Sequence, residues 1–208
     1  GRSSTGPSMN QSVFIVDDDR AVRDSISLWL SCHSYNSVCF EDAMQFIQQF
    51  TADLSGCIIA DIRMPGMDGI ELQAHLNEMG CQLPLIFITG HGTVPMAVEA
   101  MRNGALDYLR KPVNEQQLLL KVEEAFATDE ANSQRRQQTL EHQTQLNSLT
   151  KREQQIAALV VDGLANKVIA SDLSISERTV EVHRASVMLK LEAKTLPELV
   201  KSYLKITE

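Results

Sequence analysis

The sequence predicts an α/β domain with a doubly wound, five-stranded parallel sheet, followed by an all-α domain of four helices with a helix-turn-helix. Three observations lead to this prediction. Short apolar runs without polar alternation recur along residues 13–109, which is typical of parallel strands buried on both faces. Segments with helical spacing of apolar residues separate these runs, as crossover helices require. From Thr150 onward, only helix-length segments with capping residues remain.

The apolar runs give the strands of the first domain, and the segments between them give its helices. Asp42 is a typical helix start, and Asn103-Gly104 is a typical helix stop. Strands are expected at residues 13–16, 37–40, 57–60, 85–88 and 106–109. Helices are expected at residues 21–32, from 42 to 50, around 70–76, at 94–101 and through 118–126.

The net charge of −8 is unevenly distributed. Residues 1–148 hold 10 Lys+Arg and 19 Asp+Glu, whereas residues 149–208 hold 9 and 8. The first part is therefore a poor binder of polyanions, and the second can bind one if its cations cluster. Four cysteines lie far apart without a C-x-x-C pair, which predicts reduced thiols and a cytoplasmic protein. Because no apolar run approaches the length of a membrane span, no membrane association is expected.

Two segments are expected to lie outside the two domains, which we place at residues 12–128 and 149–208. Residues 1–11 are small and polar, and are expected to be a disordered tail left from cloning. Residues 129–148 lack Gly and Pro, and their first eleven residues contain no large apolar side chain. This composition predicts a solvated helical linker. A coiled-coil dimer seam is the alternative, although no heptad pattern runs through the segment.

The second domain shows a series of helix boundaries. Thr150 and Glu153 form a capping-box pattern before the first helix, and Gly163 ends that helix. A short helix is expected at 166–173, and Ser176 is a good N-cap for a longer one at 177–191. A second capping box, T-L-P-E at 195–198, starts the last helix. Two helices joined by a short turn, with the second one longer, predict a helix-turn-helix.

Polar side chains follow four of the predicted strands. Asp17 and Asp18 follow the first strand, Asp61 the third, Thr89 the fourth and Lys111 the fifth. The carboxyl ends of parallel strands meet in the crevice where such sheets bind ligands. Three carboxylates that close together repel one another unless a cation lies among them, and hard oxygen ligands favour Mg²⁺ or Mn²⁺. A cation, a lysine and a hydroxyl around a free carboxylate fit phosphoryl transfer to that carboxylate.

Several motifs resemble those of a known family. VDDD (16–19), D-x-x-M-P-x-M-x-G (61–69), T-G (89–90) and D-Y-L-x-K-P (107–112) resemble the CheY-like receiver domain of bacterial two-component response regulators. L-T-x-R-E (149–153), G-L-A-N-K-x-I-A (163–170), I-S-x-x-T-V (175–180), V-H-R (182–184) and K-L (190–191) resemble the LuxR-type helix-turn-helix. The pairing of the two is similar to the FixJ/NarL group, and most of all to FixJ-like members.

The resemblance implies a role for each residue at the strand ends. Asp61 would be the phosphoacceptor, Lys111 would pair with the phosphoryl group, and the Lys111-Pro112 bond would be cis. Thr89 would move toward the phosphate and draw Tyr108 inward. The implied Mg²⁺ ligands are Asp18 and Asp61, Asp17 mostly through water, and the main-chain carbonyl of Arg63. His91 flanks the site at a position that the family uses to tune the lifetime of the phosphoryl group.

The helix at 177–191 has two faces. Its core stripe is expected to consist of Val180, His183, Val187 and Leu191. The resemblance would turn the opposite face toward the DNA major groove, with Arg178, Glu181, Val182, Ala185 and Met188. It would make Lys167, Thr179 and Arg184 phosphate contacts. Because the net charge of 149–208 is only +1, a helical module that binds proteins is the alternative.

The resemblance implies a transcription factor controlled by phosphorylation. A sensor histidine kinase would phosphorylate Asp61, and homodimers would then bind palindromic double-stranded DNA at promoters, with RNA polymerase as a further partner. The receiver would catalyse only its own phosphoryl transfer and autodephosphorylation. The rival is a phosphatase of the haloacid dehalogenase type with Asp17 as nucleophile. Such an enzyme needs an acidic pair after the lysine, where only Glu123-Glu124 is available, and it leaves Asp61 unexplained.

Overall fold

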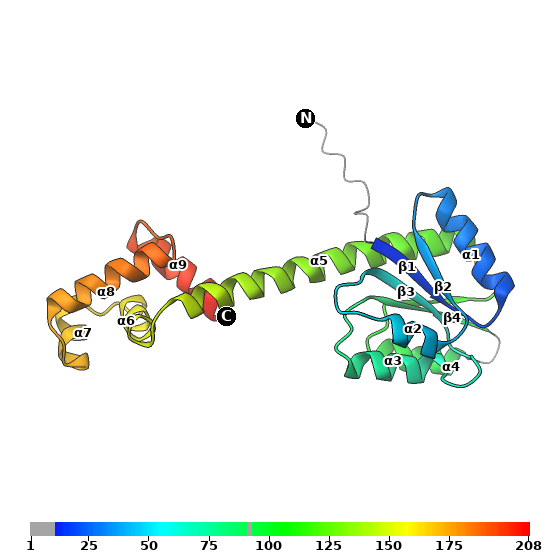
Figure 1. Ribbon diagram of the computed structural model, residues 1–208, viewed down its shortest axis with the longest axis horizontal. Coiled ribbons are helices and arrows are strands. Elements are labelled where there is room, and N and C mark those ends of the chain that lie inside the picture. Colours follow the sequence, from blue (N-terminus) through cyan, green and yellow to red (C-terminus); the bar gives the residue numbers. More distant parts are fainter. Residues whose placement is uncertain (1–10, 91–92) are drawn as a thin grey trace, which may run out of the picture. The chain divides into compact units, whose positions relative to one another are not determined.

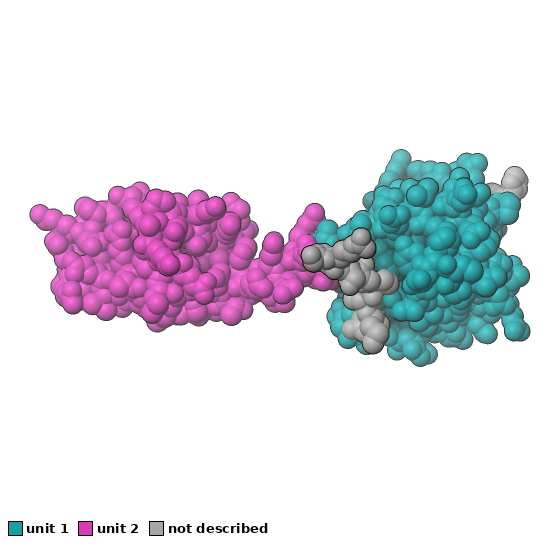
Figure 2. All heavy atoms as spheres, turned by 90° about the horizontal axis from the view of Figure 1, so that it is seen from above, with its two compact units in different colours: residues 1–132 teal, residues 133–208 magenta. Residues whose placement is uncertain are grey.

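The computed structural model describes residues 11–90 and 93–208. The tail predicted at 1–11 thus lies outside the described residues apart from Gln11, which is already part of a strand, and His91 lies outside them as well. The chain divides into two compact units, Gly1–Asn132 and Ser133–Glu208 (Figure 2). Among the described helices, none combines the length and the apolar composition that crossing a membrane requires.

The first unit contains the predicted five-stranded parallel sheet, in the order β2-β1-β3-β4-β5. The strands are β1 (Gln11–Val16), β2 (Ser37–Phe40), β3 (Ser55–Asp61), β4 (Leu85–Thr89) and β5 (Asp107–Arg110). The central strand β3 pairs with β1 on one side and with β4 on the other. Parallel pairing brings the carboxyl ends of all five strands to one edge, and Asp61 is the last residue of β3.

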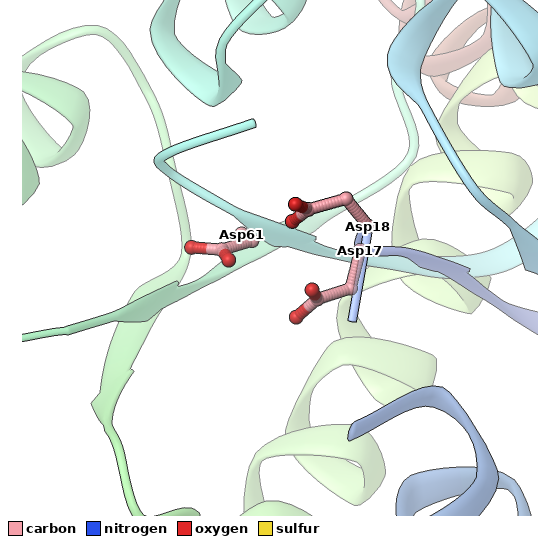
Figure 3. A group of neighbouring side chains, drawn as sticks. All are labelled: Asp17, Asp18 and Asp61. Atoms are coloured by element: carbon pink, nitrogen blue, oxygen red, sulfur yellow. The ribbon is translucent and has the colours of Figure 1, made fainter. Parts of the chain in front are cut away.

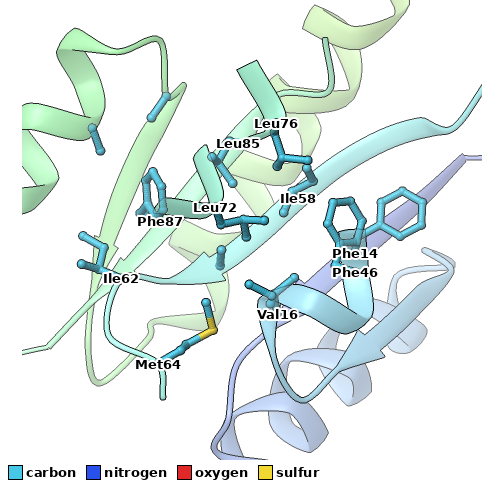
Figure 4. Packing of buried hydrophobic residues seen from close by; sticks show 14 of the residues in the cluster. Phe14, Val16, Phe46, Ile58, Ile62, Met64, Leu72, Leu76, Leu85 and Phe87 are labelled. Carbon is cyan, nitrogen blue, oxygen red and sulfur yellow. The ribbon is translucent and has the colours of Figure 1, made fainter. Parts of the chain in front are cut away.

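Helices cover both faces of the sheet (Figure 1). On one face, α1 (Arg20–Cys32) and the first part of α5 (Glu115–Ser148) pack on alternate residues of the strands. On the other face lie α2 (Ala43–Gln49), α3 (Gly69–Glu78) and α4 (Val94–Arg102). Figure 4 shows side chains of this second core, in which Phe14 and Phe46 lie with ring centroids 5.6 Å apart. The two cores hold β3 buried on both faces, as its apolar run predicts.

The loop after β3 is held tightly against the strand. Gly69 donates its N–H to the carbonyl of Ile62 (2.7 Å) and begins α3. A Cβ atom at Gly69 would lie 2.6 Å from the carbonyl oxygen of Asp61 and 2.8 Å from the ring of Phe87. Only glycine leaves room for the chain to turn back this close to Asp61. The D-G pair at 68–69 thus fixes where the strand end and the following loop lie.

Helix α5 continues without interruption through the segment predicted as a linker. Its buried residues are spaced as one stripe: Leu118, Val122, Ala125 and Asp129. The prediction that the solvated segment begins at residue 129 is therefore wrong for Asp129, which is only 2% exposed. Most residues from 130 to 145 are exposed, as a solvated helix requires. The division between the two units falls after Asn132, within this helix.

The second unit contains α6 (Lys151–Val161), α7 (Asn166–Leu173), α8 (Glu177–Lys190) and α9 (Leu196–Thr207) around one apolar core. The predicted N-caps Thr150 and Ser176 both accept main-chain hydrogen bonds, and Thr150 forms the complete capping box with Glu153. The second capping box is only half formed. Thr195 accepts from the N–H of Glu198, but the Glu198 carboxylate accepts from the N–H of Lys194, one residue earlier than predicted.

Glu153 is a buried acid in the second unit, with an exposed fraction of 2%. Its carboxylate accepts hydrogen bonds from the N–H of Thr150 (2.9 Å) and from Nζ of Lys190 (2.7 Å). Burial alone would raise the pKa of Glu153, but these hydrogen bonds outweigh burial and lower the pKa from 4.5 to about 2. The ionised form therefore ties the start of α6 to the end of α8.

This depressed pKa predicts a pH-dependent stability of the second unit. The contribution of Glu153 should be complete above pH 4.5 and should disappear as the pH falls toward 2, because the unfolded state then binds the proton more tightly. We expect a loss of about 2 kcal/mol in the free energy of unfolding, since Lys190 is partly exposed. This loss is measured by urea titrations of the full chain at several pH values, in which the NMR methyl signals of Val180 and Val187 report unfolding of the second unit. Glu153→Gln should flatten the dependence over this pH range, whereas the exposed-site variant Glu177→Gln should retain it.

Candidate functional site

Three carboxylates meet at the carboxyl edge of the sheet, as the strand ends predict (Figure 3). Asp17 and Asp18 directly follow β1, and Asp61 ends β3. One oxygen atom from each lies within 4.8 Å of the others. Asp17 and Asp61 are buried, whereas Asp18 is exposed. The cluster is therefore built into the sheet on one side and open to solvent on the other.

Lys111 supplies the positive charge of the cluster. Its Nζ lies 2.8 Å from Oδ2 of Asp61 and 3.5 Å from Oδ2 of Asp17. Its main-chain N–H donates to the carbonyl of Thr89 (2.7 Å), and the Lys111-Pro112 bond is cis, as the resemblance implies. The end of β4 thus holds the backbone of Lys111 so that the side chain reaches across to β3. A variant that shortens this side chain would leave Asp61 without its cationic partner.

The electrostatics of the cluster favour a further cation. Burial raises the pKa of Asp17 to about 6, and the nearby charge of Asp61 adds to the effect, although the N–H of Asp19 opposes it (2.9 Å to Oδ1). Oδ2 of Asp17 is buried, and its contact among the described residues is the 3.5 Å ion pair with Lys111. Burial would lower the pKa of Lys111, but the hydrogen bond to Asp61 and the two carboxylate charges raise it overall. Lys111 contacts two of the three acids, Asp17 and Asp61, so the cluster keeps excess negative charge, and its oxygen-only donor set fits a divalent cation such as Mg²⁺.

Asp61 is held by both of its oxygens. Oδ2 accepts from Lys111, and Oδ1 accepts from the main-chain N–H of Arg63 (3.2 Å). These two contacts orient the carboxylate from its own loop on one side and from Lys111, just after β5, on the other. The side chain of Arg63 is exposed, and the ligand role of its main-chain carbonyl stays a prediction.

Thr89 and Tyr108, the predicted switch pair, lie on neighbouring strands. Thr89 ends β4 and is buried, and its hydroxyl donates to the carbonyl of Leu109 at 3.5 Å. Tyr108 lies opposite Phe87 in the β4–β5 register and packs half-buried against the core on the α2–α4 face. The hydroxyl of Thr89 therefore faces the backbone of β5 in this structure, and the switch role of both residues stays a prediction.

Most residues of α8 lie on the buried or the exposed face that the sequence predicts for them. Val180 and Val187 are buried, and Leu191, just after the helix, is buried as well. His183, which the pattern places on the same stripe, is only half-buried. On the opposite face Arg178, Glu181, Val182 and Ala185 are all exposed. Met188 is a correction: it packs partly against the core of the second unit instead of facing outward.

The three predicted phosphate contacts differ in their surroundings. Lys167 is exposed in the first turn of α7. The hydroxyl of Thr179 shares a hydrogen bond with that of Ser176 (2.8 Å) at the start of α8. Arg184 is half-buried, and its Nη1 donates to Oδ1 of Asn166 (3.0 Å), which joins α8 to the start of α7. Asn166 was not identified from the sequence, because a pairing 18 positions apart leaves no periodic signal.

The acidic pair considered for the phosphatase interpretation, Glu123-Glu124, lies outside this cluster. Glu123 and Glu124 are exposed on α5, and Glu124 pairs with Lys121 (3.2 Å). Lys121 also contacts Asp107 (2.6 Å), so these charges form a separate surface network. Lys111 contacts both candidate nucleophiles, Asp61 at 2.8 Å and Asp17 at 3.5 Å. Which of the two carboxylates reacts therefore stays a prediction.

Each of the two units matches a known protein family. The family described as "Response regulator receiver domain" matches residues 13–123, and "Bacterial regulatory proteins, luxR family" matches residues 147–203. The chain is 39% identical over 189 residues to "Transcriptional regulatory protein FixJ" of Bradyrhizobium diazoefficiens, with 91% of this chain and 92% of that protein covered. It is 42% identical over 198 residues to FixJ of Rhizobium meliloti, with 91% and 93% covered.

Solved structures give the same result. The "Low Resolution Structure of Response Regulator StyR" is similar with a TM-score of 0.88 and 40% identity, and 94% of this chain and 99% of that chain are covered. Full-length FixJ from B. japonicum is similar with a TM-score of 0.59 and 37% identity, with 95% and 97% covered. The chain therefore belongs to the response-regulator family and joins a receiver domain to a DNA-binding domain of the luxR family, as the FixJ transcriptional regulators do.

Proposed function

We propose that Asp61 is the phosphoacceptor of this response regulator, and that its phosphorylation controls the binding of residues 149–208 to DNA. The observation that carries the proposal is the contact between Asp61 and Lys111, at 2.8 Å, within a cluster of three acids at the end of the central strand. A carboxylate that is oriented, paired with a lysine and placed beside a cation site has the geometry of a phosphoryl acceptor. The pairing of a receiver domain with a luxR-type domain, as in the transcriptional regulatory protein FixJ, supports this link between Asp61 and DNA.

The reaction transfers a phosphoryl group from a histidine of a sensor kinase. An oxygen of Asp61 attacks phosphorus, the P–N bond to the imidazole breaks, and the imidazole takes up a proton as it leaves. Lys111 neutralises charge on the phosphoryl oxygens. Asp17, Asp18, Asp61 and the carbonyl of Arg63 would hold Mg²⁺, which supplies further charge neutralisation when bound. Attack by water on the same phosphorus returns the carboxylate, so the receiver also limits the lifetime of its own signal.

The cation site predicts pH-dependent Mg²⁺ binding. A proton competes with the cation at Asp17, whose pKa is about 6. The apparent affinity for Mg²⁺ should be constant above that pH and should fall by up to about tenfold per unit below it. Trp29, the only tryptophan, lines a hollow together with Lys111 and Pro112, so its fluorescence offers a readout for the titration. Asp17→Asn should weaken binding at pH 7 and flatten the dependence. Equal affinity at pH 5 and pH 7 for the unmodified chain would contradict the combination of a raised pKa and a ligand role for Asp17.

The output step links the phosphoryl group to DNA. Thr89 would turn from the Leu109 carbonyl toward the phosphoryl group, and Tyr108 would follow inward from its half-buried position. The rearranged surface would favour a homodimer that binds a palindromic promoter site and contacts RNA polymerase. A two-state element of this kind needs only a few kcal/mol between its states.

The exposed face of α8 is the proposed reading surface. Glu181 can accept from cytosine N4, and Val182, with 55% exposure, can contact a thymine methyl group. Ala185 would add a small apolar contact beside them. The cations proposed to contact phosphates are Lys167 and Arg184, with Thr179 as a neutral donor. Because Glu181 repels phosphate and pairs with Arg178 (3.3 Å), non-specific affinity should be low. Two half-sites bound by a dimer would compensate for this weakness.

The test measures both the affinity for DNA and the oligomeric state of the chain in solution. A palindromic duplex is first selected from a random pool with the phosphorylated chain. Beryllofluoride, a phosphoryl mimic, should then raise the affinity for that duplex about tenfold, within the usual range of allosteric coupling, and should shift the chain toward a dimer in sedimentation. Unchanged mass together with unchanged DNA affinity would refute the proposal.

A further inference from the structure

Helix α5 carries a buried acid at a position where its own pattern calls for an apolar residue. Leu118, Val122, Ala125 and Asp129 follow one another at intervals of four, three and four residues, which is the spacing of a single buried stripe. The first three pack in the apolar core with the strands. A leucine at position 129 would continue the stripe without burying a charge, so a carboxylate here calls for a specific explanation.

The carboxylate of Asp129 binds the amino end of the central strand. Its Oδ2 accepts from the hydroxyl of Ser55 (2.8 Å) and from the main-chain N–H of Gly56 (3.0 Å), residues more than 70 positions earlier in the chain. Oδ1 is buried and has no hydrogen-bond partner among the described residues. Such a contact is directional, whereas apolar side chains tolerate a shift along the helix axis. Asp129 therefore fixes the axial position of α5 on β3.

The partner backbone is itself tightly constrained. Gly56 has φ +125°, and a Cβ atom there would lie 1.9 Å from the carbonyl oxygen of Ser12 on β1. Only glycine allows β3 to start this close to β1 with its N–H available to Asp129. The acceptor on α5 and the donor on β3 thus meet where the close approach of β1 leaves no room for a side chain on β3.

The same strand carries the proposed phosphoacceptor at its other end. Lys111, just before α5, contacts Asp61 at the carboxyl end of β3, and Asp129 contacts Ser55 and Gly56 at the amino end. The segment from 111 to 129 is therefore fixed to β3 by two polar contacts. Under the proposed function, phosphorylation would give Lys111 the phosphoryl group as a partner at the first contact, while Asp129 would keep its two donors at the second. α5 thus has one variable and one fixed attachment to the strand.

We propose that Asp129 is a positioning residue: it holds α5 in register on β3, and the response of DNA binding to phosphorylation requires this register. The inference rests on the proposed function for its second half. Without the fixed contact, a change at Lys111 could be absorbed by sliding of α5 along the sheet and would reach the residues after Asn132 in weakened form. The coupling between receiver and DNA binding, and not phosphorylation itself, is what Asp129 supports.

Four variants of the full chain separate this role from plain stability. Asp129→Leu removes the hydrogen bonds from Ser55 and Gly56 but continues the apolar stripe. Asp129→Asn keeps an oxygen acceptor of the same shape, and Ser55→Ala removes only one of the two donors. Glu130→Leu is the matched control, because Glu130 is an exposed acid at the next position of the same helix.

Two readouts apply to each variant: amide hydrogen exchange of residues 126–132, and the ratio of DNA affinities with and without beryllofluoride. Asp129→Leu should lose protection in this part of α5, and its affinity ratio should fall about fivefold or more below that of the unmodified chain. Asp129→Asn and Glu130→Leu should stay within about twofold of the unmodified ratio, and Ser55→Ala should lie between. Labelling by acetyl phosphate should proceed at the unmodified rate in all four.

The outcomes are distinguishable. Unmodified exchange and an unmodified affinity ratio in Asp129→Leu would overturn the inference, as would a lower melting temperature with an unchanged ratio. If the unmodified chain itself does not respond to beryllofluoride, the proposed function fails, and the coupling role of Asp129 fails with it. Hydrogen exchange still tests whether Asp129 holds α5 in register on β3. If Asp129→Leu does not fold, Ser55→Ala decides: an affinity ratio equal to the unmodified one would contradict the proposal.

Discussion

Replacing Asp61 with asparagine should abolish the response of DNA binding to acetyl phosphate. The carboxamide is not a nucleophile, so the rate of phosphoryl incorporation should fall on the order of a thousandfold or more. The ratio of DNA affinities with and without the phosphodonor should then be one, compared with about ten for the unmodified chain. Fluorescence anisotropy of a labelled duplex, with acetyl phosphate and Mg²⁺ added or omitted, measures this ratio.

The control for Asp61→Asn removes the same charge elsewhere in the domain. Asp24 is exposed on α1, and its Oδ2 forms an ion pair with Nε of Arg20 (3.6 Å) on the surface. Asp24→Asn should keep the full response, because such exposed pairs contribute little to stability. A response that survived in Asp61→Asn, at the size seen in Asp24→Asn, would show that another residue receives the signal.

Replacing Lys111 with alanine should separate phosphorylation from switching. The variant keeps the nucleophile and the three acids, so it should still accept a phosphoryl group, but about a hundredfold more slowly, because one charge-stabilising group is lost. It also loses the 2.8 Å contact that joins Asp61 to the loop between β5 and α5. Once fully phosphorylated, the variant should therefore bind DNA no more tightly than the unphosphorylated chain.

Arg20→Ala is the matched control for Lys111→Ala. Arg20 is a cation at the start of α1, with an exposed side chain. This control should be phosphorylated and activated normally. The extent of phosphorylation is determined by gel mobility with a phosphate-binding additive before DNA binding is measured, so that slow labelling is not mistaken for failed switching. Full activation of phosphorylated Lys111→Ala would show that the lysine does not couple the two events.

The strand ends could be predicted because parallel topology leaves little freedom. An apolar run without alternation must lie inside a sheet covered on both faces, and the carboxyl ends of such strands share one edge. That alone brings Asp17, Asp61 and Lys111 together. It does not say which oxygen faces which nitrogen. That Lys111 lies nearer to Asp61 than to Asp17, and that the hydroxyl of Thr89 faces Leu109, depends on side-chain rotamers and loop geometry.

Errors arose where one side chain departed from the pattern of its element. Helical spacing placed Met188 on the outer face of α8, but a long, flexible thioether can reach around the helix to the core. Composition placed Asp129 in solvent, because a charged residue in a polar segment is normally exposed. Its position in the stripe of Leu118, Val122 and Ala125 was the available signal, but the donors Ser55 and Gly56 are distant in sequence.

The central claim, that Asp61 receives the phosphoryl group, is tested most directly by locating the adduct. The full chain is incubated with acetyl phosphate and Mg²⁺, reduced with borohydride to mark the acyl phosphate, and mapped by peptide mass spectrometry. We predict the label on Asp61 alone, and none anywhere in Asp61→Asn. Label on Asp17 that persists in Asp61→Asn would contradict the account.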